Sequence, residues 1–404
     1  MVPSIAASPG DIASVRNLFP GTEQWTYMNV AVRALLSTKV RAAVDAYIDG
    51  HMYGGWDKQA ELALIERTRQ SFARLINAEA DEVAFTKNAS EGLSAIAASL
   101  PWESGDNVVF CPELEHPNNV YPWLNLNKRL GVEVRTVEPE DGSIPADRIV
   151  ALMDENTRLV TVPTVSFSPG FIAELAPIAQ RCRELGTFFL VDAAQSIGVE
   201  HTDVNAMGVD GLAVATQKGM MAFYGTGFLY CRREWAERIQ PVYLARFGVA
   251  LDADAHETAM DIDKLEYGRG ARRFDLGNYN YLGATAAEAS LQLLHELGTL
   301  AIEQYVRGLA HRLIEGMLEL GLPVAGGPPG PHIGHIVAVG RSGGGRHYTA
   351  DDPRMNSLHD YLSENGVKLA VRRGILRFSL HVYNNAADVD RVLALTREWL
   401  QQGH

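Results

Sequence analysis

The sequence alternates short runs of apolar, β-branched and aromatic residues with longer stretches in which apolar residues recur every three or four positions. The runs are typical of buried strands, and the longer stretches are typical of amphipathic helices. Strands that alternate with helices along a chain predict a mostly parallel sheet. The expected strands are VAF near residue 83, VVF at 108, VEVRTV at 132, RLVTV at 158, FFLV at 188, LAVA at 212 and GFLY at 227.

After about residue 255 the pattern changes. Helical stretches over residues 284–297 and 301–320 precede the short strands HIVAVG, VKLAV and LRFSLHV and a last helix over about 386–401. Earlier in the chain, Asp57 is a plausible cap for a helix whose apolar residues between 62 and 76 share one face, and a helix near 174–185 stops at Gly186. We therefore expect a large α/β domain followed by a smaller α+β domain.

Composition narrows the function classes. The chain has 404 residues and a formal net charge of -13, which argues against nucleic acid or an anionic membrane as a partner because both attract a basic surface. No segment approaches the roughly 18 apolar residues that span a bilayer, and the N-terminus lacks an export signal. The three cysteines have no CxxC spacing, so neither disulfides nor a thiolate metal site is expected. A cytoplasmic enzyme without a metal fits this composition.

One lysine is a candidate for chemistry. Lys218 stands between a short apolar strand and a glycine-rich turn in ATQKGMMAFYGTGF; taken alone, a loop lysine is most often an exposed surface residue. Asp192 follows four apolar residues in FFLVDAAQ, so a carboxylate leaves the buried end of a strand, where it needs a partner. Ligands of parallel α/β sheets bind at the carboxyl ends of the strands, so both residues are expected at one site.

Three further residues extend this set. Ser90, in the turn before a helix in EVAFTKNASEGLSAIA, and the free N–H groups of that helix suit a phosphate. His116 follows the next strand, and Arg377 lies in the apolar strand GILRFSLHVYN, where a guanidinium needs an anion. Each residue also has an ordinary structural interpretation, as a cap, a loop side chain or half of an ion pair. Together they supply what pyridoxal 5'-phosphate requires, because a lysine forms its Schiff base and a carboxylate keeps its pyridine nitrogen protonated.

The segment from VDAAQSIG to GFLYCRREW, residues 191–235, resembles the cofactor-lysine region of class V aminotransferases. This fold-type I group includes cysteine desulfurases, selenocysteine lyases, isopenicillin N epimerases and several transaminases, and the similarity runs from YMNVA near residue 27 to RFSLHVYN near 384. The resemblance implies that Lys218, His116 and Asp192 are catalytic: Lys218 carries the cofactor, His116 stacks on its ring and Asp192 meets its pyridine nitrogen. The other residues that it implies are Gln195 as a donor to the ring hydroxyl, Ser90, the backbone at Ala89 and Gln217 at the cofactor phosphate, Thr216 as a further cofactor-binding residue, and Arg377 at the substrate carboxylate.

The resemblance also implies an organisation for the whole chain. Family members are homodimers with shared active sites, and RRFDLGNYNY resembles the segment that reaches the neighbour's phosphate. Asn278 stands there in place of the usual threonine and can still donate a hydrogen bond. The implied parts are an N-terminal segment over residues 1–30 that packs with the small domain, a large cofactor-binding domain over 31–255, an active-site and dimer-interface connection over 256–283, and the small domain over 284–404.

The sequence leaves the reaction open. Group II desulfurases carry a catalytic cysteine shortly before the arginine strand, yet residues 340–376 contain none, which excludes persulfide chemistry at that place. Gln217 before the lysine resembles small transaminases, whereas His116 resembles the lyase and epimerase branch, and Phe167 replaces an asparagine of many relatives. Transamination of a small amino acid is expected. The alternatives are β-elimination that breaks a C–S bond and epimerisation.

The sequence argues against two other protein classes. A nicotinamide dehydrogenase would share the sheet, but no GxGxxG motif follows a first strand. A non-catalytic protein that keeps the cofactor fold would be expected to lack Lys218 or to carry a DNA-binding extension, and the sequence shows neither. Within the enzyme interpretation, residues 242–269, rich in Tyr, Asp and His, are expected to line the substrate pocket.

Overall fold

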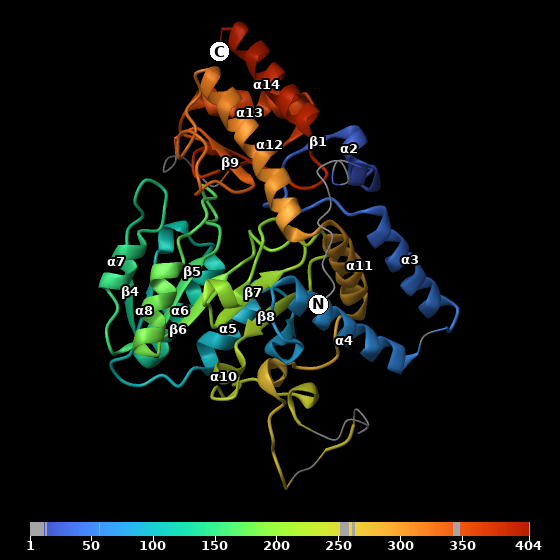
Figure 1. Cartoon of the computed structure of the whole chain (residues 1–404), viewed down its shortest axis with the longest axis vertical. Coiled ribbons are helices and arrows are strands. Elements are labelled where there is room, and N and C mark those ends of the chain that lie inside the picture. The colour runs from blue at the N-terminus through green and yellow to red at the C-terminus, as the bar shows by residue number, and fades with distance from the viewer. Residues whose placement is uncertain are drawn as a thin grey trace.

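A central sheet of seven strands organises the first half of this computed structural model, which describes residues 12, 14–55, 57–250, 258–260, 263–341 and 348–403 (Figure 1). The strand order is β2-β8-β7-β6-β5-β3-β4. Six of these strands share one direction, and β8, which lies between β2 and β7, runs opposite to them. The seven strands are β2 (Val83–Thr86), β3 (Asn107–Phe110), β4 (Glu133–Thr136), β5 (Thr157–Pro163), β6 (Phe188–Asp192), β7 (Gly211–Ala215) and β8 (Gly227–Cys231). The predicted mostly parallel sheet is thereby confirmed.

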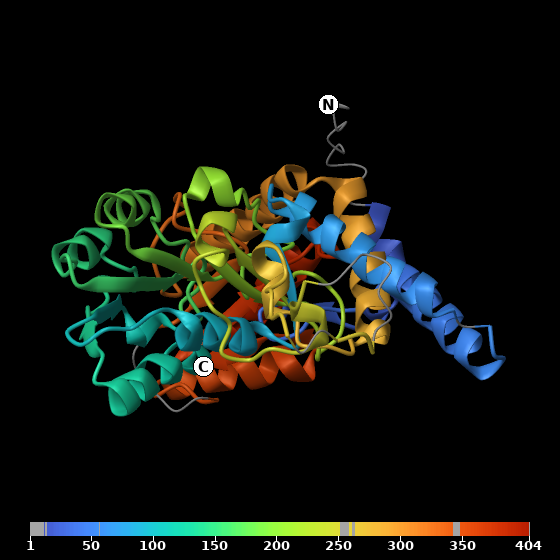
Figure 2. The same ribbon diagram turned by 90° about the horizontal axis from the view of Figure 1, so that it is seen from below.

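The inner strands such as β6 and β7 are apolar because both faces of the sheet are covered, whereas the edge strand β4, with the sequence EVRT, is partly exposed. Successive residues of β6 alternate between two hydrophobic clusters: Phe189 and Val191 belong to one, and Phe188 and Leu190 to the other. This is the two-residue period of a strand whose sides are both buried. Figure 2 shows the sheet between its layers of helices. Each such buried side chain contributes roughly 1.5–3 kcal/mol to folding.

The helices begin and end at residues with the expected capping chemistry. The carboxylate of Asp57 accepts from the backbone N–H of Gln59 at 2.9 Å at the start of α4, and α8 ends at Gly186 in the left-handed conformation. Around the sheet lie α4 (Lys58–Leu75), α5 (Ala89–Ser99), α6 (Tyr121–Leu130), α7 (Ala146–Ala151), α8 (Ala176–Leu185), α9 (Val204–Met207), α10 (Arg233–Ala236) and α11 (Tyr281–Leu297).

A smaller C-terminal domain lies above the large sheet in Figure 1. Its antiparallel sheet has the order β11-β12-β9. The N-terminal segment joins it, because β1 (Thr26–Tyr27) pairs in parallel with β10 (Val367–Lys368). The remaining elements are β9 (Ile336–Val339), β11 (Ala370–Arg372), β12 (Ile375–Ser379), α12 (Thr299–Glu319), α13 (Pro353–Glu364) and α14 (Ala386–Gln401).

At the N-terminal side, α2 (Gly21–Gln24) is followed by α3 (Thr38–Met52), whose far end projects from the body (Figure 2). Val40 and Val44 of α3 pack with Ala286 and Ala287 of α11. Among the described residues, no helix is both long and apolar enough to cross a bilayer.

Candidate active site

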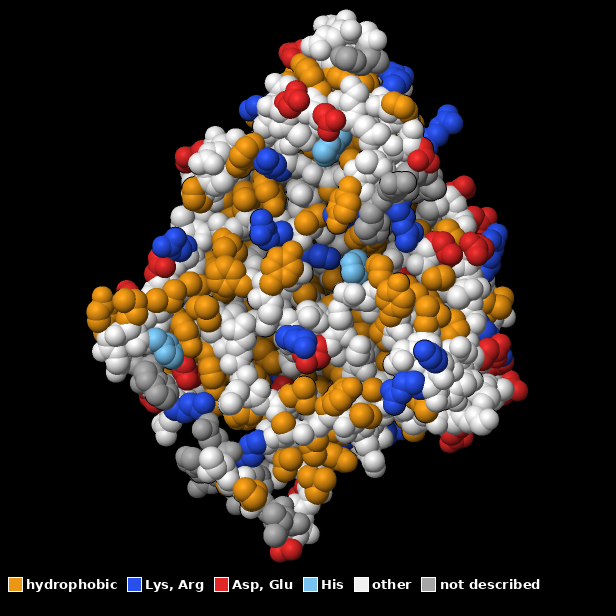
Figure 3. All heavy atoms as spheres, turned by 180° about the vertical axis from the view of Figure 1, so that it is seen from behind, with side chains coloured by type: hydrophobic (Ala, Val, Ile, Leu, Met, Phe, Trp, Pro, Cys, Tyr) orange, Lys and Arg blue, Asp and Glu red, His pale blue; other side chains and the backbone are white. Residues whose placement is uncertain are grey.

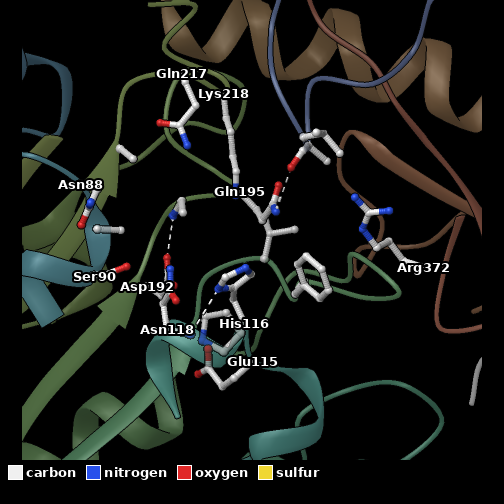
Figure 4. Close-up of a pocket in the computed structure, with 18 of the residues that line it drawn as sticks. Asn88, Ser90, Glu115, His116, Asn118, Asp192, Gln195, Gln217, Lys218 and Arg372 are labelled. Atoms are coloured by element: carbon white, nitrogen blue, oxygen red, sulfur yellow. Dashed lines mark hydrogen bonds between the residues drawn. The ribbon is translucent and has the colours of Figure 1, made fainter. Parts of the chain in front are cut away.

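The turn after β7 holds Lys218 in a fixed position. The carbonyl of Gln217 accepts from the N–H of Ala34 at 2.9 Å, and the carbonyl of Lys218 accepts from Met221 at 2.8 Å. Gly219 follows the lysine because a Cβ there would overlap the carbonyl oxygen of Ile197. Sequence neighbours of Lys218 therefore serve to place its side chain, which Figure 4 shows extending into a cavity.

This cavity lies between the carboxyl end of the large sheet and the C-terminal domain, and it encloses about 390 Å³. Binding sites for small ligands are commonly of this size. Every predicted site residue except Thr216 and Asn278 lines it. The predicted residues that it brings together are Ala89, Ser90, His116, Asp192, Gln195, Gln217, Lys218 and Arg377.

Asp192, the last residue of β6, presents a carboxylate to the cavity. Its side chain is buried, with the residue 6% exposed, and its Oδ1 accepts from the N–H of Ala194 at 2.9 Å. Burial raises the pKa of Asp192, and the charge of Lys218 offsets this only in part. A buried carboxylate in this position is stabilised by a cationic N–H donor, which fits a protonated pyridine nitrogen.

Lys218 has an unusually acidic ammonium group. Burial lowers the pKa of Lys218 to about 8; the nearby charges of Arg377 and Arg372 lower it further, and Asp192 acts in the opposite direction. An amine is nucleophilic only when it is neutral, and a pKa near 8 gives a sizeable neutral fraction near neutral pH. Lys218 is therefore suited to bond to an aldehyde and to exchange protons.

The N-terminus of α5 forms an anion cradle. The side chain of Asn88 caps the helix by accepting from Glu91 at 3.0 Å. The N–H groups of Ala89 and Ser90 have no hydrogen-bond partner among the described residues and lie beside the Ser90 hydroxyl. Figure 4 places Asn88 and Ser90 on one side of the cavity and Gln217 near Lys218. Free helix N–H groups and side-chain donors fit a phosphate.

The two remaining predicted residues lie outside the cavity lining. Thr216 is buried, and its hydroxyl donates to the carbonyl of Phe223 at 2.6 Å, so this side chain closes the loop that carries Lys218. Asn278 is exposed on the segment before α11 and has a positive φ of 32°.

His116 is oriented by the backbone next to it. Its Nδ1 accepts from the N–H of Asn118 at 3.2 Å, so the neutral ring carries its proton on Nε2. The His116 ring meets Phe167 edge to face with 5.2 Å between the centroids. Gln195 donates from Nε2 to the carbonyl of Ala31 at 3.2 Å, while its Oε1 is buried without a partner among the described residues. Gln195 thus keeps an acceptor oxygen for a ligand.

Arg377 on β12 is the most unusual group of the site. It is 0% exposed, and among the described residues its guanidinium makes one hydrogen bond, from Nη1 to the carbonyl of Phe167 at 2.6 Å. Nε and Nη2 have no partner among the described residues. These two atoms form one edge of the guanidinium, the edge that binds a carboxylate in bidentate fashion. Burial, followed by the charge of Arg372, lowers the pKa of Arg377 to about 9.

Two charged residues that line the cavity, Glu115 and Arg372, were missed by the sequence interpretation. Glu115 precedes His116 and is 1% exposed, with neither carboxyl oxygen hydrogen-bonded within the described part of the chain. Burial and the charge of Asp192 raise its pKa well above the usual value. Arg372 lines the cavity from β11. The sequence did offer a signal for each residue. Glu115 stands beside the candidate His116, and Arg372 lies in an apolar strand next to a turn that contains glycine.

Residues 242–269 were expected to line the substrate pocket. The described residues of this stretch, 242–250, 258–260 and 263–269, do not line the cavity. Residues 251–257 and 261–262 of that stretch lie outside the described residues. The residues that surround the substrate space come instead from the N-terminal segment, the large sheet and the β11–β12 hairpin.

Comparison with known proteins adds the family. The aminotransferase class-V profile matches residues 50–392. An uncharacterized aminotransferase of Bacillus subtilis is 29% identical over 385 residues, 94% of this chain and 97% of that protein. A probable cysteine desulfurase of Pyrococcus abyssi is 30% identical over 402 residues, 95% of this chain and 96% of that protein.

Solved structures agree with the fold. The apo cysteine desulfurase of Thermococcus onnurineus NA1 superposes with a TM-score of 0.82 at 26% identity, covering 96% of this chain and 98% of that one. A mutant of C-DES with glycine covalently linked to its PLP cofactor gives a TM-score of 0.81 at 22% identity, covering 94% and 98%. With the cavity's lysine, buried aspartate and anion cradle, these matches show that the chain belongs to the class V aminotransferase family of pyridoxal-phosphate-dependent enzymes.

Proposed function

We propose that the protein acts on the α-amino group of a small amino acid and that its reaction is transamination. The observation that carries this proposal is the buried, unpartnered Nε–Nη2 edge of Arg377 in the same cavity as Lys218. Such an edge is costly to bury without an anion. An α-carboxylate satisfies it and brings the neighbouring amino group towards the lysine.

When bound, pyridoxal phosphate supplies an aldehyde for the amine and a ring that accepts electrons from Cα. Ser90, Gln217 and the N–H groups of Ala89 and Ser90 would hold its phosphate, and Asp192 would hold a proton on its ring nitrogen. Arg377 would fix the substrate carboxylate, which sets the direction of the Cα–H bond. Lys218, with its pKa of about 8, would remove that proton and hold it on Nζ for the next proton transfer.

The cysteines favour transamination over a persulfide route. Cys111, Cys182 and Cys231 are buried, and burial raises the pKa of each thiol, well above the range in which thiolates form at neutral pH. None of them lines the cavity. A reaction that transfers sulfur to a protein thiolate therefore has no support among the described residues, although several relatives are named cysteine desulfurases.

His116 supports a second candidate, β-elimination across a C–S bond without a protein persulfide. His116 lines the cavity, and its Nδ1 accepts from the N–H of Asn118, so the neutral ring carries a proton on Nε2 that a departing sulfur could take up. Elimination and transamination begin with the same removal of the Cα proton by Lys218 and differ in what leaves or is protonated next. The products therefore distinguish the two.

We also propose that the active form is a homodimer. Asn278 is exposed beside Leu276, which together with Tyr243 lines a second hollow next to Asn88 and Ser90. On the face shown in Figure 3, hydrophobic side chains are spread over the middle and the lower half, with several Lys and Arg side chains among them. A partner seated near the phosphate cradle would bring its own Asn278 within reach.

The first experiment follows the visible absorbance of the purified holoprotein as amino acids are added without a keto acid. Transamination converts the yellow cofactor stoichiometrically to the pyridoxamine form, whereas elimination consumes the amino acid and leaves the yellow form in place. Lys218→Ala should abolish covalent cofactor attachment and turnover while the protein stays folded. Lys128→Ala, at an exposed position of α6, is the matched control. Turnover retained by Lys218→Ala would refute the proposal.

A further inference from the structure

A second arginine faces the same cavity as Arg377, and the hairpin between β11 and β12 explains why. Arg373 and Gly374 form its two-residue turn, with φ values of 47° and 87°, as in the type I′ turns that suit strand twist. The resulting register pairs Ala370 with Arg377. Arg372 is two residues from Ala370, so its side chain and that of Arg377 emerge on the same face of the sheet.

The two guanidinium groups share one cavity without sharing an anion. Both line it, and no carboxylate of the described residues acts on the pKa of either arginine. Arg372 is half-buried, donates from Nη1 to the carbonyl of Val371 at 2.7 Å, and lies 5.1 Å from the ring centroid of Tyr348. Like charges at neighbouring positions of a sheet repel each other. This arrangement therefore favours a ligand that brings negative charge.

The cofactor does not provide that charge at this place. Figure 4 shows Arg372 on the opposite side of the cavity from Asn88 and Ser90, where the phosphate cradle lies. Asp192 is needed for the ring nitrogen. One substrate carboxylate satisfies the free edge of Arg377, which leaves the charge of Arg372 unmatched.

The anchors of the two arginines keep their charges apart. Arg377 is tied to the carbonyl of Phe167 and Arg372 to that of Val371. Diagonal neighbours on paired strands are about 7–8 Å apart at the backbone. Two separate acidic groups on a short carbon chain match this spacing better than a single carboxylate.

We infer that the substrate is an amino acid with a second acidic group in its side chain, of the size of aspartate or glutamate. Arg377 binds its α-carboxylate and Arg372 binds its side-chain acid. This inference rests on the proposed function, because it extends the same site. Arg372 thereby determines specificity and takes no part in proton transfer.

A binding experiment tests the inference without turnover. Succinate and butyrate both have four carbons and lack an amino group, so neither can react, but only succinate carries two carboxylates. Calorimetric titration of the holoprotein should show succinate binding at least about 30-fold more tightly than butyrate, the scale expected for a paired, partly buried charge. Arg372→Met should remove this preference. Arg373→Asn is the matched control, because it changes the neighbouring arginine, which does not line the cavity, and should keep the preference.

Equal binding of the two acids, or a succinate preference that persists in Arg372→Met, would overturn the inference. A thermal unfolding transition measured for each variant establishes that it is folded. In the absorbance experiment, the selectivity of the holoprotein for glutamate over glutamine should fall by roughly 30-fold in Arg372→Met.

The proposed function and the inference fail in different ways. If no amino acid changes the bound cofactor, the proposed function is wrong. If alanine and glutamine convert the cofactor faster than aspartate and glutamate do, the proposed function stands and the assignment of Arg372 is wrong.

Discussion

Replacing Arg377 with methionine should make the ligand-free protein more stable while destroying its ability to bind carboxylates. The guanidinium is fully buried and makes one hydrogen bond among the described residues, and burial lowers its pKa from the ordinary value of an arginine to about 9. At 1.36 kcal/mol per pKa unit, holding the charged form in this place costs roughly 4–5 kcal/mol. Methionine has a similar length and carries no charge.

Part of that gain is lost again. Removing the guanidinium leaves the carbonyl of Phe167 without its donor, which costs roughly 1–3 kcal/mol. The net expectation is a rise of about 2 kcal/mol in the free energy of unfolding at pH 7. Replacing a binding-site residue commonly raises the stability of the protein while it removes function.

The pH dependence has a definite sign. Because the pKa of Arg377 is lower in the folded protein, the unfolded chain binds more protons between about pH 9 and 12.5, and the wild type gains stability as the pH rises through that window. The advantage of Arg377→Met is therefore complete below pH 9 and shrinks above it. Urea unfolding of cofactor-free protein at pH 7 and pH 10 measures both effects.

Arg67→Met, at an exposed position of α4, should change stability by less than about 0.5 kcal/mol and serves as the control. A clearly less stable Arg377→Met protein at pH 7 would refute the reasoning, because it would mean that the buried guanidinium is fully compensated without a ligand. The same variant should show no stabilisation by added succinate, whereas the wild type should.

Three other substitutions test separate parts of the structure. Arg373→Gly should raise the free energy of unfolding by about 0.5 kcal/mol in a urea titration, since φ is 47° at this turn position; a loss would contradict the turn assignment. Glu115→Gln should flatten the dependence of the free energy of unfolding on pH above pH 4.5. The raised pKa of Glu115 makes the wild type less stable as the pH rises towards that pKa. The same slope of stability against pH in both proteins would argue against a neutral carboxyl. Asp275→Ala should cost roughly 3–5 kcal/mol by thermal unfolding, because it leaves the buried Arg69 without its 2.7 Å partner; a loss below 1 kcal/mol would show that water replaces it.

Local patterns in the sequence were enough to predict the elements and the first chemical groups. Apolar runs such as those of β6 and β7 could be identified because a strand that is buried on both faces is apolar at every position. Lys218 and Asp192 could be placed at one end of the sheet because parallel strands end at a common edge. The cap at Asp57 and the stop at Gly186 depend on contacts within a few residues along the chain.

Contacts between distant segments were decided only by the tertiary structure. The sequence did not reveal that Glu115 is buried near Asp192, that Thr216 turns its hydroxyl away from the cavity, or that Arg372 shares a face with Arg377. Each depends on strand register, strand order or the seating of the C-terminal domain, which arise from packing over the whole chain. Periodicity and capping are short-range properties that a sequence displays directly. The pKa of a buried group depends on which charges the fold brings beside it, and that is settled only when the domains meet.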